Sequence, residues 1–323
     1  MKSLYFEKYG PSDVLSIREV PMPALESGRV QVKVHSVSLN PLDWRLMRAD
    51  PFLVRLAFGL FKPKFNCLGA DFSGVVESVA SEVSEFEVGD SVFGIMTPDI
   101  TGALSEYISI PESGLVAKPD SISHQQASTL GGAALTAYEG IHDYCAPKDG
   151  DRVLINGASG GIGTFAVQMA KALGAHVTAV CSGRNEQLVR RIGSDDVVDY
   201  QAVNLLSLSD RFDLIYDTIG NHPPKLMKQL LADGGRLVLA SAGDGMGFLK
   251  AMRAAKKDDS IELIVDLKKD KARLQAVLDL YEAGKIVPVI DREVPFEEVV
   301  SAIDHVATKR ARGKVVVNLS LTS

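Results

Sequence analysis

The stretch RVLINGASGGIGTFAVQMAKALG, residues 152–174, decides the fold of this chain. It begins with the apolar run Arg152–Asn156, which is typical of a parallel strand, and it ends in a helical pattern. The glycines between them allow a tight turn and a close approach to a pyrophosphate, and the helix offers its first amides to the phosphate charge. The stretch therefore predicts a dinucleotide-binding turn at Gly160, Gly161, Ile162 and Gly163. An ordinary strand-to-helix loop is the alternative that the glycines alone leave open.

The residues after the next predicted strand, His176–Cys181, indicate which dinucleotide is bound. An NAD site presents an acidic side chain there to the ribose 2′-hydroxyl. This chain instead has Ser182, Arg184 and Asn185, and a guanidinium can grip a 2′-phosphate through two hydrogen bonds. The cofactor is therefore expected to be NADPH. The alternative is that Arg184 is a solvated residue at the start of the following helix.

Length and composition favour a two-domain protein with small-molecule partners. The chain has 323 residues, 46% of them hydrophobic, and a formal net charge of −6 with both signs interspersed. This pattern gives neither a basic face for nucleic acid nor a polybasic membrane patch. The three cysteines show no spacing typical of a disulfide framework or a structural zinc site. No signal-peptide core or membrane-spanning run is found, so a cytoplasmic location is expected.

The hydrophobic pattern changes along the chain. Residues 1–122 carry short β-branched runs separated by Gly, Pro and Asp turns, a pattern typical of a β-barrel. Residues 123–267 begin with a helical pattern at 125–145 and then alternate strand and helix, which predicts a doubly wound parallel sheet whose last strand is 261–267. Residues 268–323 read as helix, strand, helix and strand, and are expected to return to the first domain. If the chain forms a homodimer, an exposed edge at 261–267 is the place to look for the contact.

Eight motifs in a fixed order carry a resemblance that covers nearly the whole chain. They are LNPLDWRLMR from Leu39, LGADFSGVV from Leu68, EVGDSVFG from Glu87, LGGAALTAYEGI from Leu130, the GASGGIG turn, DVVDY ending at Tyr200, YDTIG from Tyr216 and GKVVVNL from Gly313. With these motifs the chain resembles the zinc-independent medium-chain dehydrogenases/reductases of the quinone oxidoreductase type. The resemblance implies an α/β fold with a GroES-like β-barrel substrate domain built from both chain ends. A Rossmann domain would lie between them, with the active site in the cleft.

The resemblance also bears on metal binding. Zinc-dependent relatives hold the metal through two cysteines and a histidine, and the matching positions here are Asn40, Ala70 and Gly132. These residues cannot supply thiolate or imidazole ligands, so no metal is expected. Oxidation of an alcohol then lacks its usual Lewis acid, and reduction of an electron-poor acceptor is favoured.

The expected reaction is hydride transfer from NADPH to a quinone or an α,β-unsaturated carbonyl. Two alternatives remain open at this point. One is an NADPH-dependent enoyl-thioester reductase, and the other is a non-catalytic NADPH-binding sensor or scaffold whose substrate cleft is filled.

Several residues are assigned catalytic or supporting roles by the resemblance. Asn40 is expected beside the nicotinamide or the substrate carbonyl, which it could polarise, although Asn before Pro is also a turn signal. Thr136 would contact the nicotinamide amide. Tyr138 could protonate a developing enolate or simply pack in the core. An ion pair between Asp43 and Arg48 and a structural role for Asp71 are also expected.

Scaffold position predicts the remaining cofactor contacts. Ser182, Arg184 and Asn185 would hold the 2′-phosphate and Tyr200 would lie near the adenosine, whereas the ribose and nicotinamide would be bordered by Thr218, Gly220 and Ser241 to Gly243. Asn318 would either close over the nicotinamide or serve only its own domain as an edge-strand amide. The apolar segment 51–65 would line a hydrophobic acceptor site or form a core or oligomer contact.

Overall fold

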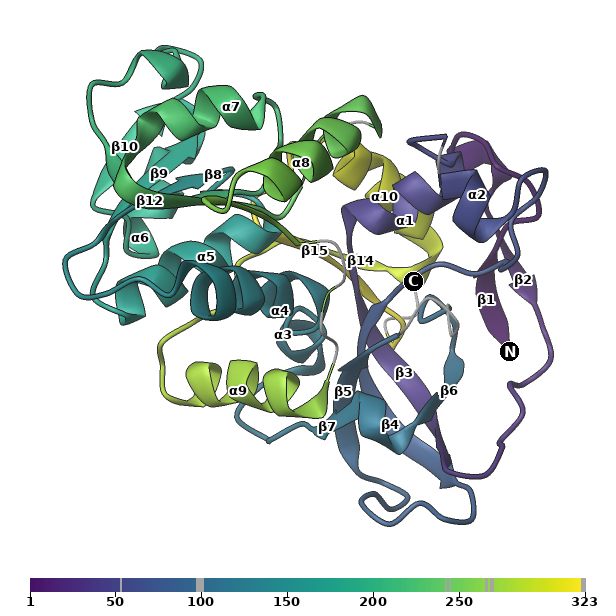
Figure 1. The fold of residues 1–323 in the computed structure, drawn as a ribbon. Coiled ribbons are helices and arrows are strands. Elements are labelled where there is room, and N and C mark those ends of the chain that lie inside the picture. The colour runs from purple at the N-terminus through teal and green to yellow at the C-terminus, as the bar shows by residue number, and fades with distance from the viewer. Residues whose placement is uncertain are drawn as a thin grey trace. The chain divides into compact units, whose positions relative to one another are not determined.

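The computed structural model describes residues 1–52, 54–96, 102–241, 243, 245–264, 267 and 270–320. The chain divides into two compact units (Figure 1). The first unit comprises Met1–Ala133, Lys269–Asp279 and Ile290–Ser323, and the second comprises Ala134–Lys268 and Leu280–Val289. The domain boundaries expected near residues 122 and 267 stay a prediction, because a division by packing does not show which segments act together.

The second unit contains a six-stranded parallel sheet. Its strands are β8 (Arg152–Asn156), β9 (His176–Cys181), β10 (Asp196–Asp199), β11 (Phe212–Asp217), β12 (Leu231–Leu239) and β13 (Ile261–Leu263). They lie in the order β10-β9-β8-β11-β12-β13, and every neighbouring pair is parallel. Counted within the sheet, this order is 3-2-1-4-5-6, the doubly wound dinucleotide-binding topology. The predicted Rossmann sheet is confirmed, with its switch point between β8 and β11.

The helices that follow these strands are short, apart from two. The two longer helices are α5 (Gly161–Ala172) and α8 (Gly245–Lys257), and the short ones are α6 (Glu186–Arg191) and α7 (Pro224–Met227). The sheet is buried by apolar side chains such as Leu154, Ile215 and Leu237. Strand β13 lies at the edge of the sheet and ends at Leu263, and Val265 and Asp266 of the expected 261–267 strand lie outside the described residues.

The helix expected over residues 125–145 is divided into three segments. These are α3 (His124–Ala127), α4 (Gly132–Tyr138) and a π-helical segment, Glu139–Cys145. The first interruption follows from side-chain hydroxyls that compete for helical carbonyl groups. Ser128 Oγ donates to the Gln125 carbonyl at 2.9 Å, and Thr129 Oγ1 donates to the Gln126 carbonyl at 2.7 Å. The helical prediction was therefore right in type and wrong in continuity.

The first unit is built on a seven-stranded sheet that combines strands from the N-terminal and C-terminal parts of the chain. Its strands are β3 (Arg29–Leu39), β4 (Asp71–Val79), β5 (Ser91–Ile95), β6 (Tyr107–Pro111), β7 (Leu115–Ala117), β14 (Ile290–Pro295) and β15 (Lys314–Asn318). The order is β14-β15-β3-β4-β5-β7, with β6 paired to the other half of β3. β15 pairs with β3 antiparallel, so the last strand lies against residues 36–39. This mixed unit matches the GroES-like fold that the resemblance implies.

Smaller elements complete the first unit. They are the strand pair β1 (Lys2–Tyr5) and β2 (Ser16–Glu19), with the helices α1 (Pro41–Arg48), α2 (Val54–Phe58), α9 (Lys271–Glu282), whose last turn lies in the second unit, and α10 (Val299–Ala307). The apolar segment 51–65 contains α2 and is divided in its burial. Phe58 and Phe65 pack against the core, whereas Leu56 and Phe61 are 68% and 88% exposed.

The glycine-rich turn after β8 is shaped by one close approach. Gly157 has a φ of 86°, in the left-handed region that favours glycine. A Cβ atom on Gly163 would lie 2.7 Å from the Ala158 Cα and closer still to the Gly157 carbonyl oxygen. The first turn of α5 therefore packs directly on the backbone of the turn. At Gly160 the nearest atom to an added Cβ would be 3.4 Å away, which is an ordinary contact.

We predict that Gly163→Ala lowers the free energy of unfolding by about 1 to 3 kcal/mol, because the added methyl group overpacks a backbone-to-backbone contact. Urea unfolding followed by circular dichroism measures this change. Gly160→Ser is the matched control, since it adds a Cβ at ordinary contact distance and a preferred N-cap hydroxyl. Its stability should stay within about 0.5 kcal/mol of the native value. Equal losses in both variants would contradict the packing explanation.

Candidate functional site

The N-terminus of α5 provides the features of a phosphate site. Gly160 donates its amide to the Gly157 carbonyl at 3.0 Å, which closes the turn. The amides of Gly161, Ile162 and Gly163 belong to the first helical turn and have no acceptor within the helix. They lie at the positive end of the helix dipole, beside the switch point of the sheet. This geometry fits the pyrophosphate of a dinucleotide.

The turn after β11 borders the same switch point and is held by a buried carboxylate. Asp217 Oδ1 accepts hydrogen bonds from Asn156 Nδ2 at 2.8 Å, from the Ile219 amide at 2.9 Å and from the Gly220 amide at 3.0 Å. Burial raises the pKa of Asp217, although these hydrogen bonds oppose the change. Thr218 Oγ1 donates to the Asn156 carbonyl at 2.8 Å. Thr218 and Gly220 are thus fixed against the end of β8.

Sequence reasoning missed Asp217 and Asn156. Each is a polar residue at the carboxyl end of an apolar parallel strand. The same placement on two strands was the sequence signal that could have identified them.

The residues expected at the 2′-phosphate do not all point outward. Arg184 is exposed, whereas Ser182 and Asn185 are buried. Asn185 Nδ2 donates to Ser159 Oγ at 2.9 Å, so this side chain ties the end of β9 to the glycine-rich turn. Its geometry indicates a supporting role instead of a direct phosphate contact.

A carboxylate also lies at this end of the site, contrary to the sequence interpretation. Asp199, the last residue of β10, has its Oδ2 atom 2.6 Å from the position that a Cβ on Gly183 would occupy. The neighbouring Tyr200 is 57% exposed. The sequence interpretation considered only the segment after β9, and the parallel pairing of β10 with β9 brings Asp199 alongside.

Four further predicted residues follow the carboxyl end of β12 or lie in α4. Ser241 is half-buried just after β12, and Gly243 has a φ of 67°, while Ala242 between them lies outside the described residues. Tyr216 Oη donates to the Thr136 carbonyl at 2.9 Å, which anchors α4 to β11. The Tyr138 ring stacks on His142, with 4.5 Å between centroids.

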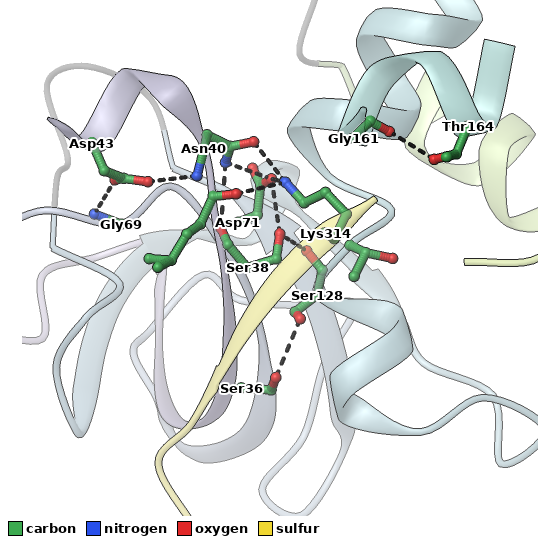
Figure 2. Close-up of polar contacts among 12 residues, drawn as sticks. Ser36, Ser38, Asn40, Asp43, Gly69, Asp71, Ser128, Gly161, Thr164 and Lys314 are labelled. Atoms are coloured by element: carbon green, nitrogen blue, oxygen red, sulfur yellow. Dashed lines mark hydrogen bonds and ion pairs between the residues drawn. The ribbon is translucent and has the colours of Figure 1, made fainter. Parts of the chain in front are cut away.

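The first unit contains a buried polar cluster centred on Asn40 (Figure 2). Asn40 Nδ2 donates to Asp71 Oδ2 at 2.9 Å and to the Ser38 carbonyl at 3.3 Å. Lys314 Nζ donates to Asn40 Oδ1 at 2.7 Å and lies 3.7 Å from Asp71 Oδ2. Asp71 and Lys314 are 0% and 2% exposed. This cluster joins residues that are far apart in the sequence.

The expected ion pair between Asp43 and Arg48 is wrong. Asp43 accepts hydrogen bonds from the backbone amides of Asn40, at 2.7 Å, and Gly69, at 2.9 Å. Arg48 instead pairs with Asp304 at 3.4 Å. Asp43 is buried at the start of α1, where a carboxylate caps orphan amides better than it pairs with an exposed guanidinium.

Asn318 is engaged within its own unit. Its Nδ2 donates to Glu293 Oε1 at 2.7 Å, and its Oδ1 accepts from the Ser320 amide at 2.9 Å. The description of Asn318 as an edge-strand amide is wrong, because β15 lies between β14 and β3.

Comparison with known proteins settles the family. The alcohol dehydrogenase GroES-like domain model matches residues 26–120, and the zinc-binding dehydrogenase model matches residues 192–317. A mitochondrial NAD(P)H oxidoreductase of Danio rerio is 33% identical, over 99% of this chain and 91% of its own length. A chloroplast envelope quinone oxidoreductase homolog of Arabidopsis thaliana is 30% identical, over 98% of both chains. This chain is a zinc-independent medium-chain dehydrogenase/reductase of the quinone oxidoreductase type.

Two more relatives extend the comparison of this oxidoreductase. A 2-methylene-furan-3-one reductase of Solanum lycopersicum is 31% identical, over 98% of this chain and 79% of its own length. The solved structure of a quinone oxidoreductase from Coxiella burnetii is 29% identical with a TM-score of 0.89, over 99% of both chains. These relatives support an NAD(P)H-dependent oxidoreductase. The names of the Danio rerio and Arabidopsis thaliana relatives specify a mitochondrion and a chloroplast envelope, so they do not support the expected cytoplasmic location.

Two of the three positions that match the zinc ligands, Asn40 and Gly132, lie at the buried polar cluster of this oxidoreductase. A Cβ on Gly132 would lie 2.9 Å from Asp71 Oδ1, so a cysteine there would displace the carboxylate. Asn40 is bound to Lys314, a cation that belongs to the chain itself. Among the described residues, no three His, Cys, Asp or Glu side chains are grouped to hold a metal ion. No helix in the described ranges is long and apolar enough to cross a membrane.

Sequence reasoning also missed Lys314, although it quoted the motif GKVVVNL. The available signal was a lysine within the otherwise apolar strand KVVVN. Burial lowers the pKa of Lys314, while the charges of Asp71 and Asp43 act in the opposite direction.

Asp43 allows a prediction about pH. Burial raises the pKa of Asp43 to about 6, against the two amide hydrogen bonds, which lower it. The folded protein therefore keeps a proton that the unfolded chain releases near pH 4. As pH rises from 4 to 6, Asp43 should reduce the free energy of unfolding by about 2 kcal/mol.

Urea unfolding between pH 4 and 7 tests this effect as the difference between the native protein and Asp43→Asn. His124, whose pKa burial lowers to about 4, acts in the opposite direction but is common to both proteins. Parallel pH curves for the two proteins would contradict the prediction.

Proposed function

We propose that this protein is an NADPH-dependent reductase of quinones or α,β-unsaturated carbonyl compounds. The observation that carries the proposal is the phosphate-binding helix terminus of α5 at the switch point of the 3-2-1-4-5-6 sheet. The names of relatives add support, because they specify quinone oxidoreductases and a furanone reductase. When bound, a nicotinamide cofactor supplies the hydride for such reductions.

The second unit holds the cofactor in this proposal. The first amides of α5, Gly161 to Gly163, bind the pyrophosphate, and the turn that Asp217 fixes places Thr218 and Gly220 at the ribose. Ser241 and Gly243 border the nicotinamide end. Thr136 is assigned to the nicotinamide amide.

Arg184 grips the 2′-phosphate in this proposal, with Ser182 beside it and Tyr200 near the adenosine. Asn185 keeps the glycine-rich turn in place through Ser159. Asp199 adds a negative charge close to Gly183, so the guanidinium of Arg184 has to compensate for it if NADPH is preferred.

The first unit contributes Asn40, whose carboxamide contacts the bound nicotinamide or acceptor. Tyr138 is the candidate proton donor, since reduction of an enone or quinone also consumes a proton. Its phenol lies on a half-buried residue of α4 whose ring is fixed by stacking on His142. Exposed apolar residues of the segment 51–65, including Leu56 and Phe61, are available to contact an apolar acceptor.

We also propose a homodimer that pairs the β13 edges of two copies. The described part of β13 pairs with β12 on one side and ends the path of the sheet on the other. An apolar edge strand favours such pairing.

We predict that NADPH is oxidised faster than NADH in the presence of a quinone or a short enone, and that a chelator does not reduce the rate. The decrease in absorbance at 340 nm measures the reaction, with an enoyl thioester in the same panel. Exclusive use of the thioester would favour an enoyl-thioester reductase. Tight NADPH binding without oxidation by any acceptor would favour a non-catalytic sensor.

Arg184→Ala should weaken NADPH binding by about 1.5 to 3 kcal/mol, because it removes a charge-assisted contact to the 2′-phosphate. NADH binding should change little. Calorimetric titration measures both affinities, and Arg190→Ala, which removes another exposed arginine of the same region, is the control. Equal weakening of NADPH and NADH by Arg184→Ala would contradict the 2′-phosphate assignment.

A further inference from the structure

Lys314 is a buried charge whose donors are all directed at the protein. Its Nζ donates to the Leu39 carbonyl at 3.0 Å and to Asn40 Oδ1 at 2.7 Å, and it lies 3.7 Å from Asp71 Oδ2. An ammonium group has three hydrogens and no acceptor. Two of its hydrogens are donated to Leu39 and Asn40, the third faces Asp71 Oδ2 at ion-pair distance, and at 2% exposure none is accessible to a ligand. It can influence a ligand only through one of the groups that it contacts.

Of the three residues that Lys314 contacts, Asn40 has the polar side chain that reaches the surface. It is half-buried, whereas Asp71 is fully buried and Leu39 contributes its backbone carbonyl. Asn40 also precedes α1, and its backbone N–H donates to Asp43 Oδ2. The backbone and the side chain of Asn40 are therefore both fixed.

The orientation of the Asn40 carboxamide follows from the charges on its two sides. A carboxamide oxygen and nitrogen have nearly the same shape, so packing alone does not choose between two orientations. Lys314 can only donate and the Asp71 carboxylate can only accept. Oδ1 must therefore face Lys314, and Nδ2 must face Asp71, as Figure 2 shows.

This orientation decides what Asn40 offers to a ligand. Both Nδ2 hydrogens are directed at protein oxygens, on Asp71 and on Ser38. Oδ1 accepts one hydrogen bond from Lys314, and a carboxamide oxygen has two lone pairs. The group that remains is thus an acceptor, whereas polarising a substrate carbonyl would need a donor.

We propose that Lys314 is a positioning residue that, together with Asp71, fixes the Asn40 carboxamide so that Oδ1 accepts an N–H of the cofactor's nicotinamide carboxamide. The proposal rests on the proposed function, because it assumes a nicotinamide ligand. It replaces the earlier expectation that Asn40 polarises an acceptor carbonyl. A quinone has no N–H to donate. Asn40 Oδ1, as a hydrogen-bond acceptor, therefore favours binding of the nicotinamide carboxamide over binding of the quinone.

Binding of two oxidised cofactors tests the proposal without catalysis. NADP⁺ has the carboxamide N–H, and its 3-acetylpyridine analogue has a methyl ketone in that place. Calorimetry should show that the native protein binds NADP⁺ about tenfold more tightly than the analogue, as expected for one hydrogen bond. In Asn40→Leu and in Lys314→Met the ratio of the two dissociation constants should fall to near one.

A double variant separates positioning from general damage. If Lys314 acts through Asn40, Lys314→Met in the Asn40→Leu background should not change the ratio further. A purely structural loss would move both dissociation constants together and leave the ratio intact. Asp71→Asn keeps the side-chain volume and removes the charge that fixes Nδ2, so it should also lower the ratio. Lys33→Met, an exposed lysine of β3, is the control and should keep the native ratio.

The outcomes separate this proposal from the proposed function. A native ratio near one, or an unchanged ratio in both Lys314→Met and Asp71→Asn, would overturn the role of Lys314 while leaving an NADPH enzyme in place. The expected ratios without reduction of any acceptor would support the positioning role and count against the reductase. If the native protein binds neither cofactor, both proposals fail. Asp71→Asn keeps the test decisive if Lys314→Met does not fold, which thermal unfolding reveals.

Discussion

The buried ammonium of Lys314 is the constraint on which the arrangement of the first unit depends. Removing a charge from water costs several kcal/mol unless charged and polar partners surround it. Its partners come from the end of β3, the start of α1 and the start of β4, while Lys314 itself begins β15. Because all of them have to converge on one nitrogen, the register of the last strand against β3 and the position of Asn40 are fixed together.

The second unit depends on a different constraint, which is steric. The first turn of α5 can approach the β8 turn only because Gly163 lacks a side chain. That approach places the amides of Gly161 to Gly163 at the switch point of the sheet. Asp217 supports the same place from β11 by bonding Asn156 and the amides that follow it. The phosphate-binding geometry is therefore held by backbone packing and by one buried carboxylate.

Several side chains bind partners that differ from the ones expected. Asn185 was expected at the 2′-phosphate, and Asn318 either over the nicotinamide or within its own domain, and both donate their carboxamides within the protein, to Ser159 and Glu293. Asp43 was expected to pair with Arg48 and instead caps two amides. A buried carboxamide or carboxylate is stabilised when its hydrogen bonds are satisfied nearby. Hydrogen bonds to neighbouring protein groups therefore satisfy these side chains in the folded chain.

The sequence by itself determined the Rossmann topology, the family and the glycine-rich turn, because these depend on hydrophobic periodicity and on residues that are adjacent in the chain. It also predicted β15 as a strand but not the importance of its lysine. Only the tertiary structure decided which groups meet the Asn40 side chain, since the Ser38 carbonyl, Asp71 and Lys314 lie up to 276 positions apart in the numbering of the chain. It also brought Asp199 beside Gly183. Such contacts depend on strand register and on the need to pair buried charges, which no local pattern encodes.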